Sequence, residues 1–184
     1  RLSDSGYKTN KTGFSLGTNF EYQDDFFLGL GFSNFYEEIE TDSTASTRQR
    51  ALDGNYWDSS FNLNFDYDKR NQKFQATDGF RSRYFIEMPL ISETYALSNT
   101  FNFKSYSELY EDNVSTFSFY LRSTNSLNDE NIRLSQRIFL PSDKLRGFVR
   151  GKVGPKDGTD FVGGNYAAAI NFSSTVPKIL ENSQ

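Results

Sequence analysis

The 184-residue sequence contains no cysteine and no histidine. Without cysteine, a disulfide framework, a thiolate zinc site and a cysteine nucleophile are all excluded. Without histidine, the commonest general base and metal ligand is missing, and a Ser-His-Asp hydrolase cannot be built from this chain. We therefore expect no catalytic residue, no bound metal and no cofactor.

The sequence also lacks an excess of positive charge and a long apolar run. Its 20 basic and 24 acidic residues give a net charge of −4. Nucleic-acid binding requires a concentrated basic face, so we expect no nucleic-acid partner. No stretch approaches the ~18 consecutive apolar residues of a transmembrane helix. A membrane barrel remains possible, because its strands alternate in polarity and escape that criterion.

Aromatic residues are abundant instead. The chain has 19 Phe and 11 Tyr, yet its mean hydropathy is −0.66. Phenylalanine and tyrosine therefore supply the apolar area, diluted among Ser, Asn, Thr and Asp. This composition disfavours a helical bundle and favours strands with one apolar face and one wet face.

Alternation with period 2 dominates the sequence, and it is clearest over residues 61–68. Phe, Leu, Phe and Tyr occupy the odd positions there, while Asn, Asn, Asp and Asp occupy the even ones. A helix would scatter these aromatic residues around its circumference. The same analysis predicts six strands, over residues 12–22, 25–36, 55–68, 79–90, 94–107 and 113–122.

The lengths of strands and connections favour a membrane barrel. Several predicted strands exceed the ~5–6 residues of an average strand and fit the ~9–11 residues of a tilted membrane-crossing strand. Connections 22–25, 90–93 and 111–113 are short, whereas 37–54 and 123–162 are long and polar. Short turns on one side and long loops on the other are typical of outer-membrane barrels, so we predict an all-β, antiparallel transmembrane barrel.

A soluble β-sandwich is the structural alternative, since its strands also alternate. Two features count against it. Charged residues in mid-strand would need water or a wet lumen; they are Asp66, Arg81, Arg83, Glu87 and Lys104. The apolar faces are rich in aromatic residues, which suits contact with lipid and tyrosine near its interfaces.

The most distinctive segment is glycine-rich and runs from Lys144 to Asn165. Glycine permits positive φ and close backbone approach, so we expect this segment to form a compact, packed loop. A phosphate-binding loop is not expected. Gly151-Lys152 is followed by Val153 rather than Ser or Thr, and no Gly-x-Gly-x-x-Gly string is present.

Two sets of motifs resemble the Omp85 superfamily, and most of all its BamA-like β-barrel assembly factors. The first set is Leu145, Arg146, Gly147 and Phe148, then Gly154 and Pro155, then Gly163, Gly164 and Asn165. These are similar to the Arg-Gly-Phe motif of the family's sixth extracellular loop and to the Gly-Gly-Asn motif that opens its twelfth strand. The second set, Asp68 to Asn71 and Ala76 to Gly79, resembles a family turn in which proline usually stands at the position of Ala76.

The resemblance implies part of a sixteen-stranded barrel. The six predicted strands would be strands six to eleven, residues 123–162 loop six, and residues 163–177 strand twelve, with Pro177 near its periplasmic end. The other strands and the N-terminal POTRA domains would lie outside this chain. An open arc of seven strands has two unpaired edges, so we do not expect it to fold stably alone.

The resemblance also implies a non-enzymatic function. The BamA-like members of the superfamily help unfolded outer-membrane proteins to insert and fold. Such a function would place this chain in the outer membrane of a Gram-negative bacterium. The implied partners are client barrels, assembly-machinery lipoproteins and the lipid bilayer. No catalytic or metal site is implied.

In the family, the motif arginine locks loop six inside the lumen. Arg146 would have that role here, since its planar guanidinium group stays charged. Gly147 would allow the bend and Phe148 would pack beside it. The family's acidic partner belongs to strand thirteen, and Asp66 or Glu87 could take part.

Several rival functions remain open. One is a related Omp85 transporter, either a translocation and assembly module or a two-partner secretion protein. The others are an outer-membrane enzyme such as a barrel phospholipase, and a passive porin. The absence of histidine argues against the enzyme, and a plain porin has no reason to carry both the Arg-Gly-Phe and the Gly-Gly-Asn motif.

Overall fold

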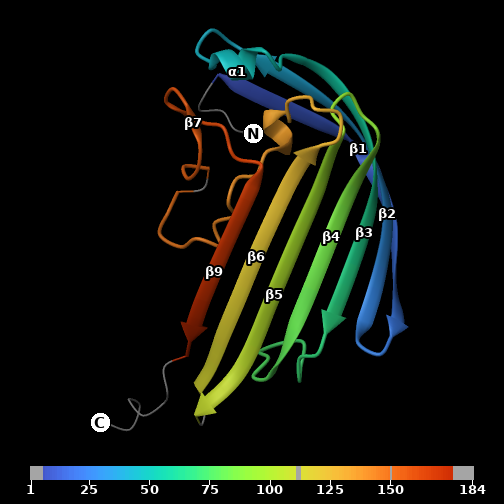
Figure 1. The fold of residues 1–184 in the computed structure, drawn as a ribbon, viewed down its shortest axis with the longest axis vertical. Helices are drawn as coiled ribbons and strands as arrows, with labels where there is room; N and C mark the ends of the chain where they lie inside the picture. Colours follow the sequence, from blue (N-terminus) through green and yellow to red (C-terminus); the bar gives the residue numbers. More distant parts are fainter. Residues whose placement is uncertain (1–5, 111–112, 150, 176–184) are drawn as a thin grey trace.

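A computed structural model describes residues 6–110, 113–149 and 151–175. Its main feature is one antiparallel sheet of seven strands, each paired with the next in the chain except that β6 pairs with β9. The strands are β1 (Tyr7–Gln23), β2 (Phe26–Thr41), β3 (Gly54–Asp68), β4 (Gly79–Ile91), β5 (Ala96–Tyr110), β6 (Asn113–Ser126) and β9 (Tyr166–Ser174). Figure 1 shows the sheet as an open, curved arc.

The remaining elements are short and belong to the connections at one end of the sheet. They are the helix α1 (Thr47–Arg50), the 3-10 turn η1 (Leu134–Gln136) and the hairpin of β7 (Lys156–Asp157) and β8 (Asp160–Phe161). No helix in the described ranges is long and apolar enough to cross a membrane. We call residues 127–165, which connect β6 to β9, the long loop.

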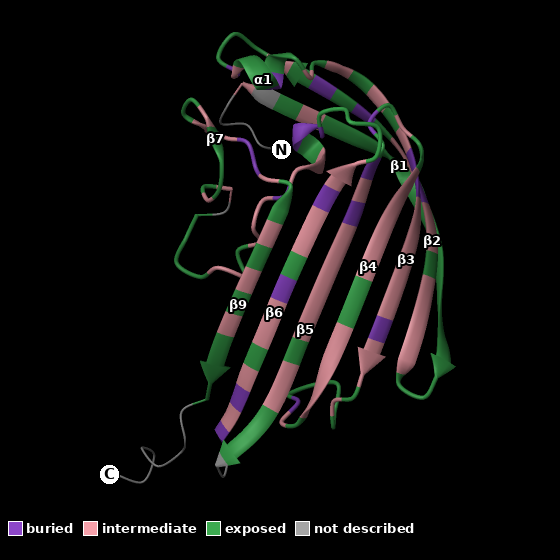
Figure 2. Cartoon of the chain, viewed as in Figure 1, coloured by how far each residue is buried: buried purple, intermediate pink, exposed green. Residues whose placement is uncertain are grey.

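The sheet is a single layer with chemically different faces. Side chains alternate between the faces, so the odd and even residues of each strand separate cleanly. The convex face carries the large apolar residues, such as Leu16 and Ile170, each 67% exposed. The concave face carries Ser, Asn, Asp and Arg, and the long loop lies against it at one end. Many of the buried positions gather there, below η1 (Figure 2).

A continuous row of aromatic rings crosses the convex face near the short-turn end. Neighbouring rings have centroids 5.7 to 6.5 Å apart. The row consists of Tyr22, Phe26, Tyr67, Phe80, Phe103 and Phe117, one from each of β1 to β6. Such pairs contribute about 0.5–1.5 kcal/mol beyond their burial. Their position matches the aromatic girdle of a membrane barrel.

A second aromatic pair marks the other border of the apolar band. Tyr36 and Trp57 have ring centroids 6.2 Å apart, and Glu38 follows Tyr36 on the same face. From Phe26 to Tyr36 the chain rises roughly 33 Å along the strand. With a tilt of about 45° this is about 23 Å across a bilayer, close to the ~25 Å band of outer-membrane barrels. The convex face therefore fits a lipid bilayer in chemistry and in height.

These observations confirm the predicted fold class, a partial antiparallel transmembrane barrel. The sandwich alternative is wrong, because the described residues form only the seven-stranded sheet and the β7–β8 hairpin. No second sheet of described residues covers the aromatic face.

Two predicted connections differ from the structure. The polar loop expected over 37–54 is wrong at its start, because β2 continues to Thr41 and Ile39 still pairs with Gly54 on β3. Within this extension Glu37 faces the concave side, where the hydroxyls of Thr9 and Ser135 donate to it.

The predicted division into short turns and long loops is also only partly correct. The short connection between Ile91 and Ala96 lies at the long-loop end, because β4 ends beside Ser59 of β3. Conversely, the connection at 69–78 lies at the short-turn end and is longer than expected there. The predicted turn at 111–113 falls mostly outside the described residues.

The last strand also begins later than expected. Gly163, Gly164 and Asn165 precede β9, which starts at Tyr166. Pro177 lies outside the described residues.

Candidate functional site

The concave wall is built from polar side chains that hydrogen-bond between strands. Ser15 on β1 donates to Ser33 on β2, and Asn62 on β3 donates to the same hydroxyl, at 3.1 and 2.8 Å. On β5 and β6, the hydroxyls of Ser98 and Thr124 are 3.0 Å apart. These hydroxyls and the amide nitrogen of Asn62 each find a partner on a neighbouring strand, which orders this part of the wall.

One arginine of the long loop is buried against this wall. Arg133 is only 1% exposed, which is rare for an arginine and requires compensation. Its Nη2 donates to both carboxylate oxygens of Asp58 on β3, each at 2.5 Å, and its Nη1 donates to Glu37 on β2 at 3.5 Å. Its guanidinium also lies 4.4 Å from the ring centroid of Tyr56. We call Arg133, Glu37, Asp58 and Tyr56 the loop clamp.

The loop clamp extends into a wider network. Glu37 accepts hydrogen bonds from Thr9 on β1 and from Ser135 in the loop, both at 2.8 Å. Asp58 accepts a further bond from Ser92, in the connection between β4 and β5, at 2.5 Å. Removing one partner of a buried ion pair leaves an uncompensated charge and costs about 3–5 kcal/mol. The clamp therefore holds the long loop directly to β2 and β3, and through their carboxylates to β1 and the β4–β5 connection.

A small apolar core lies beside the clamp. Ile39 on β2, Leu134 in η1 and Val162 near the end of the loop are 1%, 5% and 2% exposed and form one cluster. Leu52 and Tyr56 pack against it. Because Arg133 and Leu134 are adjacent, the same turn brings both an ion pair and an apolar contact to the wall.

The two ends of the long loop are tied to each other and to the sheet. Ile138 and Gly164 exchange backbone hydrogen bonds of 2.8 and 3.0 Å, and the carbonyl of Asn165 accepts one from Thr124 at the end of β6. Gly163 has φ +66°, and a Cβ there would lie 3.0 Å from the carbonyl oxygen of Ile138. A side chain at this position would be both strained and crowded.

The rest of the glycine-rich segment forms the β7–β8 hairpin. The amide of Val162 donates to the carbonyl of Pro155 at 3.0 Å, which closes the base of the hairpin. Gly154 has φ +121°, a conformation that favours glycine. Gly154 and Pro155 thus start the return of the chain toward the wall.

The Leu-Arg-Gly-Phe segment begins on the wall and leads away from it. Asn171 on β9 donates to the carbonyl of Lys144 at 3.1 Å, and the Lys144 ammonium lies 5.6 Å from the Tyr120 ring centroid. Leu145 is half-buried, and Gly147 has φ +83°, which bends the chain. Phe148 is 60% exposed.

Arg146 is exposed and has no hydrogen bond or ion pair with any residue in the described ranges. Asp66 is instead bound by Arg81, and Glu87 accepts a hydrogen bond from Ser60. A lock formed by Arg146 therefore stays a prediction, with its partner expected on a neighbouring strand outside this chain.

The second motif forms the 69–78 turn, where its side chains satisfy the backbone. Arg70 donates to both carboxylate oxygens of Asp68 at 2.7 Å, and these bonds raise the pKa of Arg70 above its ordinary value. Asn71 accepts bonds from the amides of Thr77 and Asp78 at 3.2 and 3.3 Å. The motif is thus explained by the architecture of the turn.

Gly79 ends this turn at the start of β4. It has φ +90°, and a Cβ there would lie 2.1 Å from the carbonyl oxygen of Lys69. Only glycine fits this close approach between two backbone segments.

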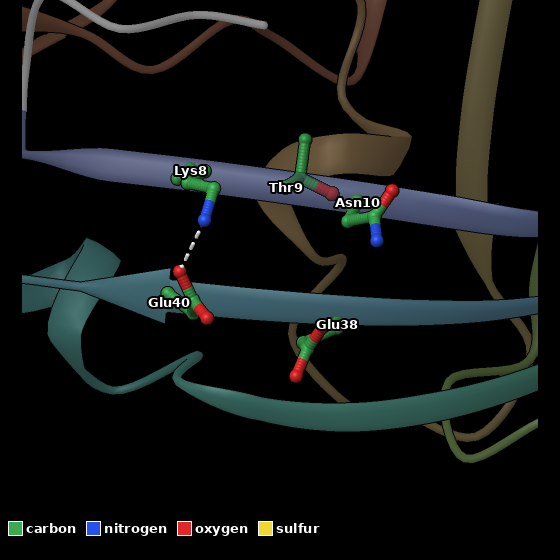
Figure 3. Close-up of a pocket in the computed structure, with 5 residues that line it drawn as sticks. All are labelled: Lys8, Thr9, Asn10, Glu38 and Glu40. Atoms are coloured by element: carbon green, nitrogen blue, oxygen red, sulfur yellow. Dashed lines mark hydrogen bonds and ion pairs between the residues drawn. The ribbon is translucent and has the colours of Figure 1, made fainter.

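A shallow hollow at the edge of β1 carries charged residues but no evident chemistry. Figure 3 shows Lys8 and Glu40 pointing toward one another across β1 and β2. They form an ion pair of 2.7 Å, and both side chains are more than half exposed. Such surface pairs are worth about 0–1 kcal/mol. The described residues also contain no group of three or more metal-ligating side chains.

Sequence reasoning missed the loop clamp. The predicted strand ends at residue 36, whereas β2 continues to Thr41, so the prediction placed the carboxylate of Glu37 in a loop. Arg133 had a usable signal, since it stands between Ile132 and Leu134 in an otherwise polar stretch. Both aliphatic neighbours are buried. A charged residue between two buried aliphatic residues is often buried and paired itself.

Comparisons with known proteins agree with this architecture. A solved structure of BamA from Haemophilus ducreyi, lacking POTRA domains 1–3, superposes with a TM-score of 0.75 at 21% identity. The match covers 95% of this chain but only 38% of that one, so this chain spans well under half of its relative. At this identity the match establishes the fold. No curated protein matches the chain. The sequence profile of the Omp85 superfamily domain matches residues 2–183, so the chain belongs to the Omp85 superfamily.

Proposed function

We propose that the protein containing this segment is an outer-membrane assembly factor that helps β-barrel proteins to insert and fold. The observation that carries the proposal is the docked long loop: it bears the Leu-Arg-Gly-Phe motif and lies on the wet concave wall of a sheet whose other face suits lipid. A passive porin has no reason to carry this motif together with the Gly-Gly-Asn motif. Membership of the Omp85 superfamily and the BamA-like fold support the same conclusion.

The physical problem that such a factor addresses is the polarity of the unpaired backbone. Each orphan N–H or C=O group in lipid costs several kcal/mol, so a strand cannot enter the bilayer alone. A protein edge that offers hydrogen bonds lowers this cost. We assign that edge to the first and last strands of the whole barrel, as the resemblance to the family implies, and not to the free edges of β1 and β9 in this segment. The function requires no covalent chemistry, and we propose no enzymatic activity.

In this proposal, the convex face contacts the bilayer and the concave face lines an aqueous lumen. The clients are unfolded outer-membrane proteins, and assembly lipoproteins act as partners. The location is the outer membrane of a Gram-negative bacterium. The segment's own contribution is structural: it forms the wall that receives the long loop and fixes where the motif segment begins.

Reconstitution of the full-length protein tests this proposal. Proteoliposomes containing it, with its lipoproteins, should accelerate the folding of an added barrel client, measured by the heat-sensitive shift of folded barrels in gels. Empty liposomes provide the control. No acceleration would contradict the proposal, and export of a soluble passenger without client folding would instead identify a related Omp85 transporter.

A further inference from the structure

A second polar feature lies on the concave wall, at the opposite end from the loop clamp. It is a hollow of about 220 Å³ at the short-turn end of the sheet, lined by residues of β4, β5 and the 69–78 turn. We call it the basic hollow. Its polar lining is Arg70, Arg81, Arg83, Asn102, Lys104 and Tyr106. The proposed assembly role uses none of these side chains.

Two of the four cations are already neutralised. Arg81 donates to Asp66 at 2.8 and 2.5 Å, and Arg70 donates twice to Asp68 at 2.7 Å. Both carboxylates are therefore occupied by a planar guanidinium fork. These bonds fix the positions of Arg70 and Arg81, which then form a rigid floor for the hollow.

The other two cations have no counter-ion. Arg83 and Lys104 are exposed, and neither forms an ion pair with any residue that the structure describes. Arg83 stands opposite Asp66 across β3 and β4, yet Asp66 is bound by Arg81. Lys104 stands directly opposite Arg81. Like charges in that position destabilise a sheet.

The hollow thus holds two more positive than negative charges, in a chain whose net charge is −4. Such a local excess favours the binding of an anion. The donors that are available to an anion are the free guanidinium of Arg83, the ammonium of Lys104 and the amide of Asn102. Arginine forks match carboxylates and phosphates equally well, so spacing must distinguish between them.

The spacing favours an extended polypeptide. Arg83 pairs with Asn102 across β4 and β5, which places Lys104 on its diagonal. Diagonal neighbours on one face are about 7–8 Å apart at Cα. In an extended chain, side chains two residues apart lie on one face and about 6.6 Å from each other. Two carboxylates at alternate positions can therefore meet both cations at once, whereas a single phosphate needs both side chains to converge.

We propose that the basic hollow binds an extended polypeptide segment with acidic residues at alternate positions. Arg83 and Lys104 contact the carboxylates, while Arg70 and Arg81 shape the floor. The identification of this segment as part of an unfolded client rests on the proposed assembly function. The binding itself is an independent property of the wall.

Binding is measured with the full-length protein in detergent micelles. The probe is a fluorescein-labelled peptide of alternating Glu and Thr, and the matched control peptide has Gln in place of every Glu. Fluorescence anisotropy should detect the Glu peptide but not the Gln peptide. The affinity should fall as salt rises, because the contacts are partly exposed ion pairs.

Variants locate the site. The double substitution Arg83→Gln with Lys104→Gln should raise the Kd for the Glu peptide at least about tenfold, since it removes both free charge-assisted donors. Lys152→Gln removes an exposed cation from the long loop and should leave the Kd unchanged. The gel shift of the folded barrel verifies that both variants fold.

Three results would overturn the proposal: equal binding of both peptides, an unchanged Kd in the folded double variant, or binding of inorganic phosphate in place of the peptide. The assembly function is judged separately by the client-folding assay. Peptide binding without client folding would refute the assembly function and support the proposed peptide site in the basic hollow. Client folding without peptide binding would refute only the proposed peptide site.

Discussion

Arg133 in the long loop and Asp58 on β3 are 75 residues apart in the sequence, and the loop arginine's Nη2 lies 2.5 Å from both carboxylate oxygens of Asp58. Arg133 also donates to Glu37. The two contacts together fix the first part of the long loop at a defined point on the wall. The motif segment that contains Arg146 begins at Leu145, only 12 residues further on. The position of the motif therefore depends on a clamp outside the motif.

Arg133→Gln in the full-length protein should release the first part of the long loop. The buried carboxylate of Glu37 and the half-buried carboxylate of Asp58 lose their cation, at a cost of about 3–5 kcal/mol. We expect faster proteolytic cleavage within residues 127–165 while the barrel keeps its heat-sensitive gel shift. Arg48→Gln, which changes an exposed arginine of α1, is the matched control.

Neutralising Glu37 and Asp58 should restore part of the loop attachment that Arg133→Gln removes. Adding Glu37→Gln and Asp58→Asn to Arg133→Gln removes the unpaired charges, so cleavage should slow again relative to the single variant. Wild-type cleavage rates in the single variant would show that the clamp does not hold the loop.

Arg146→Ala in the full-length protein should impair the assembly of client barrels, because the predicted lock then loses its cation. The measurement is the level of folded porins in a strain carrying only this variant. Arg48→Ala is again the control. Wild-type porin levels would count against the lock, and the loop clamp would then remain as the attachment supported by the structure.

Gly79→Ala should destabilise the turn at 69–78. The new methyl group would lie 2.1 Å from the carbonyl oxygen of Lys69, at a residue with φ +90°. Strain and displacement together should cost about 1–3 kcal/mol. Gly158→Ala is the matched control, since Gly158 also has positive φ but open space around it. Equal shifts of the unfolding midpoint in denaturant would show that the close approach does not matter.

Asp42, in the connection between β2 and β3, should titrate below its ordinary range. Hydrogen bonds from the hydroxyl and amide of Thr44, at 2.5 and 2.7 Å, lower the pKa of Asp42. A lowered pKa in the folded state stabilises the connection above the ordinary value of 3.8, and this contribution is lost as pH falls through the folded pKa.

Carboxyl chemical shifts measured by NMR should therefore place the midpoint of Asp42 below 3.8. Thr44→Val removes the hydroxyl donor and should move the midpoint back toward that value. An identical midpoint in both proteins would refute the assigned cause.

The sequence predicted most of the sheet, because alternation is a local signal. Phe61, Leu63 and Phe65 separate from Asn62 and Asn64 without an error, and the structure places the two groups on opposite faces. The motif at 68–79 was recognisable for the same reason, since its hydrogen bonds join residues close in the sequence.

The attachments of the long loop could not be read in this way. The clamp joins Arg133 to carboxylates on β2 and β3. In the sequence, most of the sheet lies between these strands and Arg133. The composition around Glu37 resembles a loop, and only the curved wall shows that the carboxylate is buried. The free donors of Arg83 and Lys104 likewise become visible only once Asp66 is seen to bind Arg81.

The central claim is that lipid covers the convex face while water fills the concave side. It is tested most directly by spin labels at single cysteines in a cysteine-free full-length protein reconstituted in liposomes. Labels at positions 62, 63, 64 and 65 of β3 should alternate: 63 and 65 should be accessible to oxygen, which partitions into lipid, and 62 and 64 to a water-soluble nickel complex. Accessibility without alternation, or with the two faces exchanged, would contradict the account.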